Sequence, residues 1–246
     1  LKEIFDQPVS LSNALGGRIA ADGEKAHLSG FRMKPSEMKK LDRINIVACG
    51  TAYYAAEIIS SYIRKYSNVR SEAFLSSEFP AKSVCSNNTL TIGISQSGET
   101  KDTLDALTKA KKYKSKIGSM CNVIGSTIAR YTGNGAYLYA GPEFAVASTK
   151  VFTNMIAVGL LFALTISNIN QEEQKKIVNE LRKIPNIISN QLSVNVSKYE
   201  KAVDLILKST FPIFIGRGGL SSYLAKEGAL KMMEVSYIPC LSFPGG

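Results

Sequence analysis

Between residues 44 and 139, short runs of aliphatic and β-branched residues alternate with longer segments in which apolar residues recur every three to four positions. The short runs predict strands and the longer segments predict amphipathic helices. The expected strands are 44–49, 72–75, 90–95, 117–123 and 136–139, and the expected helices are 52–65, 100–113 and 126–130. This alternation is typical of a parallel sheet with crossover helices, so we predict an α/β fold, a three-layer αβα domain with a doubly wound parallel sheet.

Helical patterns dominate the second half of the chain. The expected helices cover 148–166, 171–191, 196–208 and 220–237, and a further strand covers 212–216. Pro185 is expected to kink the second of these helices. One strand and one helix cannot bury both faces of a parallel sheet, so we expect the second unit to be incomplete.

The residues before the first strand are more weakly patterned. Pro8 in a first turn and a glycine pair at 16–17 predict a helix over 8–15, and a polar linker follows it. We therefore divide the chain into a lead-in at 1–40, a first domain at 41–190 and the start of a second domain at 191–246.

Composition excludes several classes of protein. The hydrophobic content of 45% suffices for a buried core. The longest apolar run, 155–166, is shorter than the roughly 18 to 20 residues of a membrane span, and the first residues do not resemble a secretory signal. Four dispersed cysteines and a single histidine predict neither a metal site nor a histidine-dependent catalytic triad. We expect a cytoplasmic protein without a cofactor or a membrane partner.

The net charge of +10 suits nucleic acid and smaller anions equally well. Lysines are scattered over predicted helical faces, and no recognisable nucleic-acid-binding fold accompanies them. We interpret the charge as a solvated basic surface and expect no nucleic-acid partner. Nucleic-acid binding stays an alternative that rests on charge alone.

A loop between a strand and a helix carries the clearest candidate chemistry. The apolar strand ending at residue 95 passes into Ser95-Gln96-Ser97-Gly98-Glu99-Thr100, which opens a helix. Free amides at a helix N-terminus, together with hydroxyls and a glycine that permits close approach, form a phosphate-binding site. Ordinary capping of the helix by Ser97 or Thr100 is the alternative.

Two further loops are expected at the same edge of the sheet. Gly50 and Thr51 follow the first strand, and residues 141–150 follow the last strand of the domain with Ser148 at the start of a helix. Loops at the carboxyl ends of parallel strands converge on one crevice, so Thr51 is expected to face the same ligand as the loop at 95–100. A turn at Gly50 with Thr51 as N-cap is compatible with this role.

Glu227, Lys231 and Glu234 are spaced i, i+4 and i+7 and share one face of a predicted helix. Solvated ion pairs explain this spacing. A carboxylate beside a lysine on a ligand-facing helix can instead move a proton between adjacent carbons of a sugar. The spacing alone leaves both interpretations open.

Six short motifs follow one another along the chain: Ala48-Cys-Gly-Thr51, Ser95-Gln-Ser-Gly-Glu-Thr100, Gly141-Pro-Glu, Val146-Ala-Ser-Thr-Lys150, Gly216-Arg-Gly218 and Glu227-Gly-Ala-Leu-Lys231. Together they resemble the sugar isomerase (SIS) region of the glutamine:fructose-6-phosphate amidotransferase family, also called glucosamine-6-phosphate synthases. The resemblance spans the chain. It implies an αβα module followed by a second copy, amino-sugar synthesis as the process and a homodimer as the assembly.

The resemblance also implies a ligand and residue roles. The ligand would be a phosphosugar, namely fructose 6-phosphate, glucose 6-phosphate or glucosamine 6-phosphate. Its phosphate would bind Ser95, Gln96, Ser97 and Thr100, and its hydroxyls would lie near Thr51, Val146 and Ser148. Glu234 would transfer the proton between sugar C1 and C2, supported by Lys231.

The family's glutamine-hydrolysing domain and its C-terminal histidine and lysine segments do not occur in these 246 residues. We therefore expect a chain that binds its ligand better than it catalyses. The alternative function is a phosphosugar-sensing SIS module without catalysis. Such regulators usually carry a helix-turn-helix domain, which we do not find, and Glu234 favours the enzyme.

Overall fold

The computed structural model describes residues 1–20, 22, 25–193 and 197–246. Its helices are α1 Lys2–Phe5, α2 Gln7–Leu15, α3 Pro35–Met38, α4 Thr51–Tyr66, α5 Ala81–Val84, α6 Lys101–Lys112, α7 Thr127–Thr132, α8 Lys150–Thr165, α9 Gln171–Ser193, α10 Ser197–Leu207 and α11 Gly219–Ser236, with a short 3-10 helix at Ser76–Glu78. Its strands are β1 Arg43–Ala48, β2 Arg70–Leu75, β3 Thr89–Ser95, β4 Lys116–Cys121, β5 Gly135–Tyr137, β6 Ile213–Gly216 and β7 Leu241–Pro244. None of the helices in the described ranges is long and apolar enough to cross a membrane.

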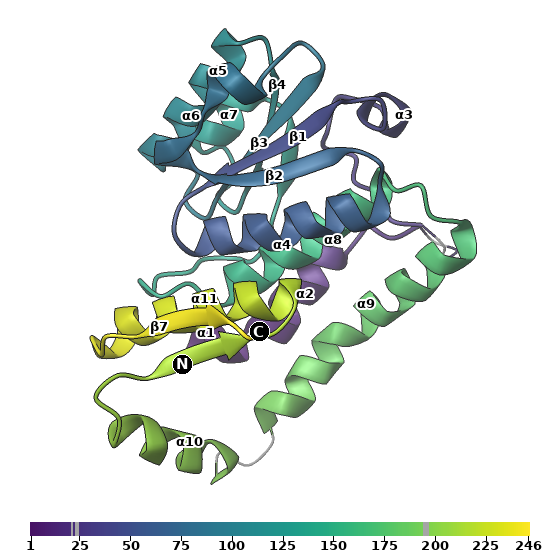
Figure 1. Ribbon diagram of the computed structural model, residues 1–246. Helices are drawn as coiled ribbons and strands as arrows, with labels where there is room; N and C mark the ends of the chain where they lie inside the picture. The colour runs from purple at the N-terminus through teal and green to yellow at the C-terminus, as the bar shows by residue number, and fades with distance from the viewer. Residues whose placement is uncertain (21, 23–24, 194–196) are drawn as a thin grey trace.

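Five parallel strands form the central sheet in the order β2-β1-β3-β4-β5. Helices α4 and α8 cover one face, and α5, α6 and α7 cover the other (Figure 1). Every residue of β3 is buried, and its apolar residues Leu90, Ile92 and Ile94 alternate with small residues, as suits a central strand that is covered on both faces. The predicted three-layer αβα fold with a parallel sheet is confirmed.

The predicted strands and helices of the first domain all occur, with ends that differ by a few residues. No end differs by more than two residues; β4, for example, ends at Cys121 instead of residue 123. The short helices α1, α3 and α5 were not predicted, because four residues are too few to show a periodicity.

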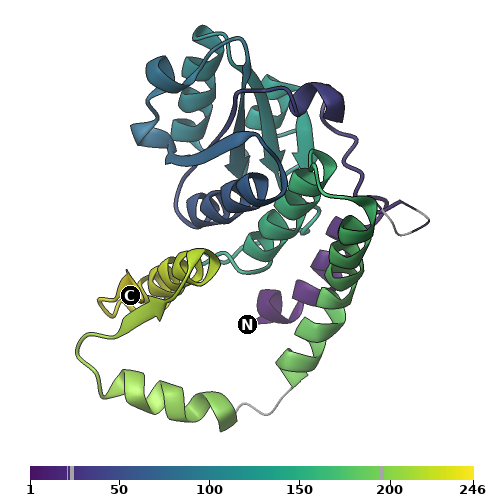
Figure 2. The ribbon, with the colours of Figure 1, turned by 45° about the vertical axis from the view of Figure 1, so that its right-hand side comes forward.

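The lead-in packs against the rest of the molecule. Helix α2 matches the helix predicted at 8–15 and lies beside α8 and α9 (Figure 2). Leu11 and Leu15 are buried there with Leu161 and Leu181. The segment interpreted as a polar linker also contributes the buried residue Phe31, whose ring contacts Phe162 at 4.8 Å between centroids. The division at 1–40, 41–190 and 191–246 stays a prediction.

Beyond the sheet domain, α9 runs through Pro185 as one helix. The helix predicted at 196–208 is α10, and residue 196 lies outside the described residues. Strand β6 and helix α11 match the prediction for the second unit. The expectation of a single strand there was wrong, because β7 pairs in parallel with β6.

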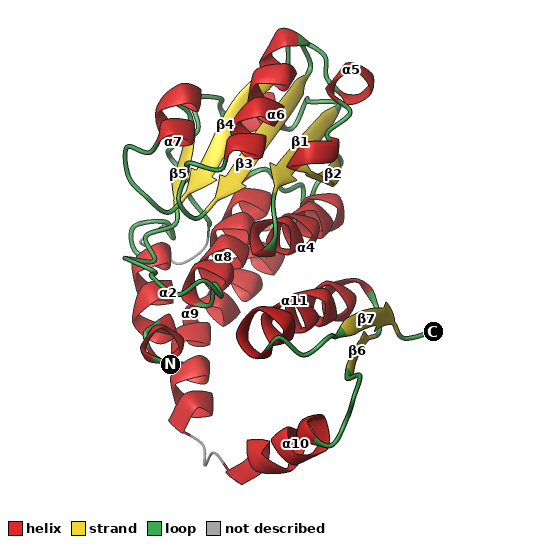
Figure 3. Ribbon diagram, turned by 90° about the vertical axis from the view of Figure 1, so that its left-hand side faces the viewer, coloured by secondary structure: helices red, strands yellow, loops and turns green. Residues whose placement is uncertain are grey.

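Helix α11 of this small unit lies against α4 (Figure 3). Lys226 of α11 forms an ion pair with Glu57 of α4 at 3.1 Å. This contact brings the C-terminal unit to the edge of the sheet where β1 and β3 end.

Candidate functional site

Strands β1 and β3 are neighbours in the sheet, but the connection after β1 leads to β2 on one side and the connection after β3 leads to β4 on the other. Crossovers that diverge at adjacent strands leave a crevice outside the carboxyl ends of those strands. A cavity of about 230 Å³ occupies this place. It is lined by Cys49, Thr51, Ala52, Ile94, Ser95, Gln96, Ser97, Thr100, Val146, Ser148, Met155 and Glu234. All of the predicted site residues except Lys231 are in this set.

The loop after β3 is held in shape by its own hydroxyls. Ser95, 2% exposed, accepts a hydrogen bond from the amide of Gly98 at 2.9 Å and pairs with the Thr100 hydroxyl at 2.9 Å. The hydroxyl of Ser97 accepts from the amide of Glu99 at 3.1 Å. Gly98 has φ +67°, and a Cβ there would lie 1.9 Å from the Ser126 hydroxyl, so only glycine fits.

Helix α6 begins at this loop without a side-chain cap. Thr100 occupies the N-cap position but makes no capping hydrogen bond, because its hydroxyl is engaged with Ser95. The amides of the first turn carry the positive end of the helix dipole. Capping by Thr100 is therefore not the role of this residue, and the helix start can receive an anion.

The loop after β1 makes a similar turn. Gly50 is the N-cap of α4 with φ +55°, and Thr51 is the first helical residue. The Thr51 side chain does not cap α4. Instead its hydroxyl donates to Oε1 of Glu227 at 3.1 Å and accepts from Nζ of Lys231 at 2.7 Å.

The face of α11 that carries Glu227, Lys231 and Glu234 is turned toward this cavity. Nζ of Lys231 lies 3.4 Å from Oε1 of Glu227 and also donates a hydrogen bond to the carboxylate of Glu234. Lys231 does not line the cavity itself but joins Thr51 to Glu234, which does. The three residues are ion-paired, as the spacing suggested, and they are paired at the wall of a cavity instead of on a solvated face.

Glu227 is the most deeply buried member of this group, at 6% exposure. Burial raises its pKa to about 7 from the ordinary 4.5, although Lys231 and the Thr51 hydroxyl act in the opposite direction. Its second oxygen, Oε2, is buried and has no hydrogen-bond partner among the described residues. Glu227 can therefore exchange a proton near neutral pH.

The loop after β5 forms the third wall of the cavity. Glu143 caps α8 by accepting hydrogen bonds from the amides of Thr149 at 2.8 Å and Val151 at 3.3 Å. The hydroxyl of Ser148 is buried, lines the cavity and has no partner in the part of the chain that the structure describes. A buried hydroxyl without a partner is rare, and a ligand oxygen would satisfy it.

The site residues predicted from the sequence include neither the apolar part of the wall, at Cys49, Ala52, Ile94 and Met155, nor the buried carboxyl of Glu227. Met155 of α8 forms part of the wall, and no local pattern distinguishes it from other apolar residues of that helix. Glu227 was identified only as one of three residues on a shared helix face, because the sequence carries no sign of its burial. Among the described residues, no cluster of three or more His, Cys, Asp or Glu side chains could hold a metal ion.

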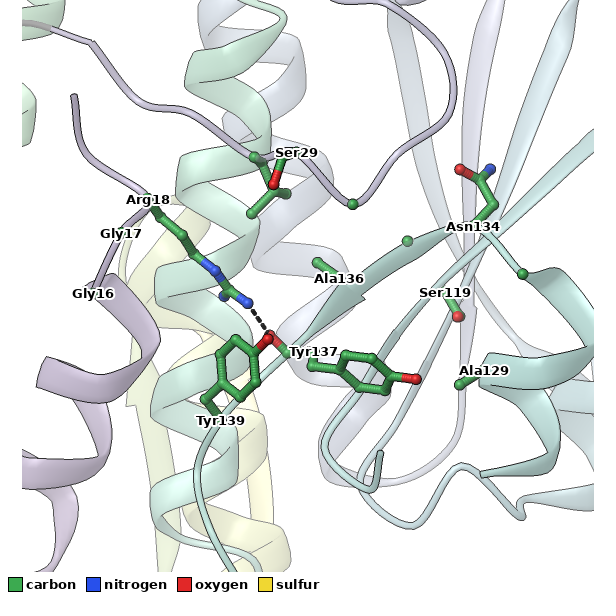
Figure 4. Close-up of a pocket in the computed structure, with 14 residues that line it drawn as sticks. Gly16, Gly17, Arg18, Ser29, Ser119, Ala129, Asn134, Ala136, Tyr137 and Tyr139 are labelled. Atoms are coloured by element: carbon green, nitrogen blue, oxygen red, sulfur yellow. Dashed lines mark hydrogen bonds between the residues drawn. The ribbon is translucent and has the colours of Figure 1, made fainter. Parts of the chain in front are cut away.

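A larger cavity of about 520 Å³ lies between the lead-in and the β4–β5 edge of the sheet (Figure 4). Arg18 enters it, donates to the carbonyl of Tyr137 and lies 4.7 Å from the ring centroid of Tyr139. Burial lowers the pKa of Arg18. No motif in the sequence marks this region, since Arg18 stands in a weakly patterned segment. The hydroxyl-bearing loops at the ends of β1 and β3 line only the smaller of these two cavities.

Comparison with known proteins yields consistent matches. Residues 37–165 match the family model of the SIS domain. The chain is 39% identical over 248 residues to a glutamine–fructose-6-phosphate aminotransferase (isomerizing) from Chlorobaculum tepidum, a match that covers 99% of this chain and 40% of that protein. The chain thus spans about 40% of the length of this curated relative.

Solved structures agree with these matches. The C-terminal domain of glucosamine-fructose-6-phosphate aminotransferase from Francisella tularensis is 34% identical, with a TM-score of 0.89 over 99% of this chain and 68% of that one. A glucosamine-6-phosphate deaminase from Thermotoga maritima is 20% identical, with a TM-score of 0.70 over 99% of this chain and 69% of that one, and shares the fold.

Proposed function

This chain belongs to the SIS domain family and matches the isomerase region of glutamine–fructose-6-phosphate aminotransferases, and we propose on that premise that its cavity binds a hexose 6-phosphate. Fructose 6-phosphate, glucose 6-phosphate and glucosamine 6-phosphate are the expected ligands. The observation that carries the proposal is the start of α6, where Thr100 leaves the helix uncapped and the loop hydroxyls surround its N-terminus.

The phosphate is proposed to bind where Ser95, Gln96, Ser97 and Thr100 line the cavity. Three of these side chains carry hydroxyl groups, which can donate hydrogen bonds to phosphate oxygens. The dipole of α6 favours the negative charge of the phosphate. The sugar would then extend toward Thr51 and Ser148, and the unpartnered hydroxyl of Ser148 supports a contact with a sugar oxygen.

Glu234 is proposed to transfer a proton between the C1 and C2 carbons of the bound sugar. Its carboxylate would remove a proton from C1 of the open-chain ketose and return it to C2, while a proton passes from O1 to O2 of the enediol intermediate. The carbonyl thereby moves from C2 to C1 and no atom is gained or lost. Lys231, which does not line the cavity, would support this transfer by holding the Glu234 carboxylate and the Thr51 hydroxyl in place. In glucosamine 6-phosphate formation, ammonia would first condense with the C2 carbonyl to give an imine and release water. The same transfer of a proton from C1 to C2, with the O1 proton passing to the C2 nitrogen, would then give the 2-amino aldose.

Calorimetry with glucose 6-phosphate tests the binding site. Replacing both Ser97 and Thr100 by alanine should weaken binding by roughly 10²- to 10⁴-fold, because two hydrogen bonds to a charged group are lost and each contributes about 1.5–3 kcal/mol. Thr108→Ala is the matched control, since Thr108 lies on the same helix and its exposed hydroxyl bonds only within it, to the carbonyl of Leu104. Parental affinity of the double variant would contradict the proposed site.

A further inference from the structure

The first helix of the chain contacts the loop that follows β5. Oε1 of Glu3 in α1 accepts hydrogen bonds from the backbone amides of Phe144 at 2.7 Å and Ala145 at 3.3 Å. The partners are more than a hundred residues apart in the sequence, so this contact exists only in the folded protein. It places a carboxylate from the lead-in on the loop that borders the cavity.

Two neighbouring contacts hold the same segments together. Lys150, a buried residue at the start of α8, forms an ion pair with Asp6 at 3.2 Å. One turn further, the Asn154 side chain accepts from the Ser10 hydroxyl at 3.0 Å and donates to the Ser10 carbonyl at 3.1 Å. The lead-in is thus fixed to the N-terminal half of α8, and Glu3 extends this attachment to the loop.

Glu3 acts at the middle of the loop, where side-chain packing is weakest. Asn122 and Glu143 bind the backbone toward the two ends of the loop. In the middle, the side chains of Phe144 and Val146 are 89% and 92% exposed, so they bury little apolar surface. Polar contacts to the backbone must therefore fix this stretch.

We propose that Glu3 is a positioning residue for the sugar site, holding the backbone at 144–145 so that Val146 and Ser148 lie against the cavity. The inference rests on the proposed function, because Val146 and Ser148 matter to a ligand only if the cavity binds one. The second oxygen of Glu3, Oε2, is buried without a partner among the described residues, so the two amide bonds orient this carboxylate.

The effect on binding follows from preorganisation. A carboxylate that accepts two backbone amides makes charge-assisted hydrogen bonds, which are stronger than neutral ones. Without them the loop samples more conformations before binding, and the ligand must select the competent one. Removing the carboxylate therefore lowers affinity although Glu3 does not line the cavity.

The test uses the full 246-residue chain with Glu3→Ala. We expect the affinity for glucose 6-phosphate, measured by calorimetry, to fall about tenfold. Hydrogen exchange at the amides of Phe144 and Ala145, measured without ligand, should accelerate. Glu3→Gln keeps a carbonyl oxygen that can accept the same amides, and we expect it to restore part of the affinity and of the protection.

Glu37→Ala is the matched control. Glu37 also accepts a hydrogen bond from a backbone amide, that of Lys34 at 2.7 Å, but it lies on α3, away from α1 and the loop (Figure 1). The Glu37→Ala variant should change neither the affinity for glucose 6-phosphate nor the hydrogen exchange of the amides at 144–145.

The outcomes separate this inference from the proposed function. Parental affinity in Glu3→Ala, or unchanged exchange at 144–145, would overturn the positioning role while the parent chain still binds sugar phosphate. No binding by the parent chain would overturn the proposed function, and this inference with it.

Discussion

Replacing Glu227 by glutamine should make the protein more stable above neutral pH. In the parent chain this carboxyl is 6% exposed and its pKa is raised to about 7, chiefly by burial. Glutamine has nearly the same shape as glutamate, and its amide oxygen can accept a hydrogen bond from the Thr51 hydroxyl. Its side chain is neutral at every pH. Lys231 keeps its contacts with Thr51 and Glu234 in the variant.

The sign and size follow from proton linkage. Between the ordinary pKa of 4.5 and the folded value of about 7, the folded state retains a proton that the unfolded state has released. The free energy of unfolding of the parent therefore falls as pH rises through this range, by about 1.4 kcal/mol per unit, or up to about 3 kcal/mol in all. This decrease in the free energy of unfolding is absent below pH 4.5 and complete above pH 7.

Urea unfolding at pH 5, 6, 7 and 8 measures this effect. The difference in unfolding free energy between Glu227→Gln and the parent should rise with pH, to about 2–3 kcal/mol more at pH 8 than at pH 5. Glu180→Gln, which makes the same change at an exposed carboxylate paired with Lys183, is the matched control. A constant difference for Glu227→Gln, or one that falls with pH, would refute the reasoning.

Two further substitutions test the catalytic proposal and the packing. Glu234→Gln should leave the affinity for glucose 6-phosphate within a few-fold but lower the rate of any isomerisation of fructose 6-phosphate roughly 10²- to 10⁴-fold. An unchanged rate of solvent-hydrogen exchange at the sugar carbon would exclude Glu234 as the base. Gly159→Ala should lower the free energy of unfolding by about 1–3 kcal/mol, because a Cβ on α8 would lie 2.2 Å from Cγ1 of Ile59 on α4. Gly219→Ala, where a Cβ meets nothing within 4 Å, should not be destabilising, and equal thermal stability of both variants would show that α4 and α8 separate easily.

Local patterns were sufficient to predict the sheet domain and part of the site. Strand β3 is buried along its whole length, and its sequence indicates a strand by Leu90, Ile92 and Ile94 at alternate positions, followed by a loop of serine and glycine. In a parallel sheet, the loops that follow the strands meet at one edge for topological reasons alone. The sequence could therefore place Thr51 near the loop at 95–100 without any knowledge of side-chain contacts, and both line one cavity. Strand β7 escaped prediction because four residues are too few to establish an alternating pattern and Pro244 argues against a strand.

The sequence by itself determined the order of the elements, the parallel sheet, the hydroxyl-bearing loops and the face shared by Glu227, Lys231 and Glu234. Only the tertiary structure decided that this face meets Thr51, about 180 residues earlier, and that Glu3 reaches the backbone of the loop after β5. Periodicity reports that one side of a helix is buried, but the element it packs against depends on how whole surfaces fit together. Burial then sets the protonation of Glu227, since the cost of a buried charge depends on every neighbour that excludes water.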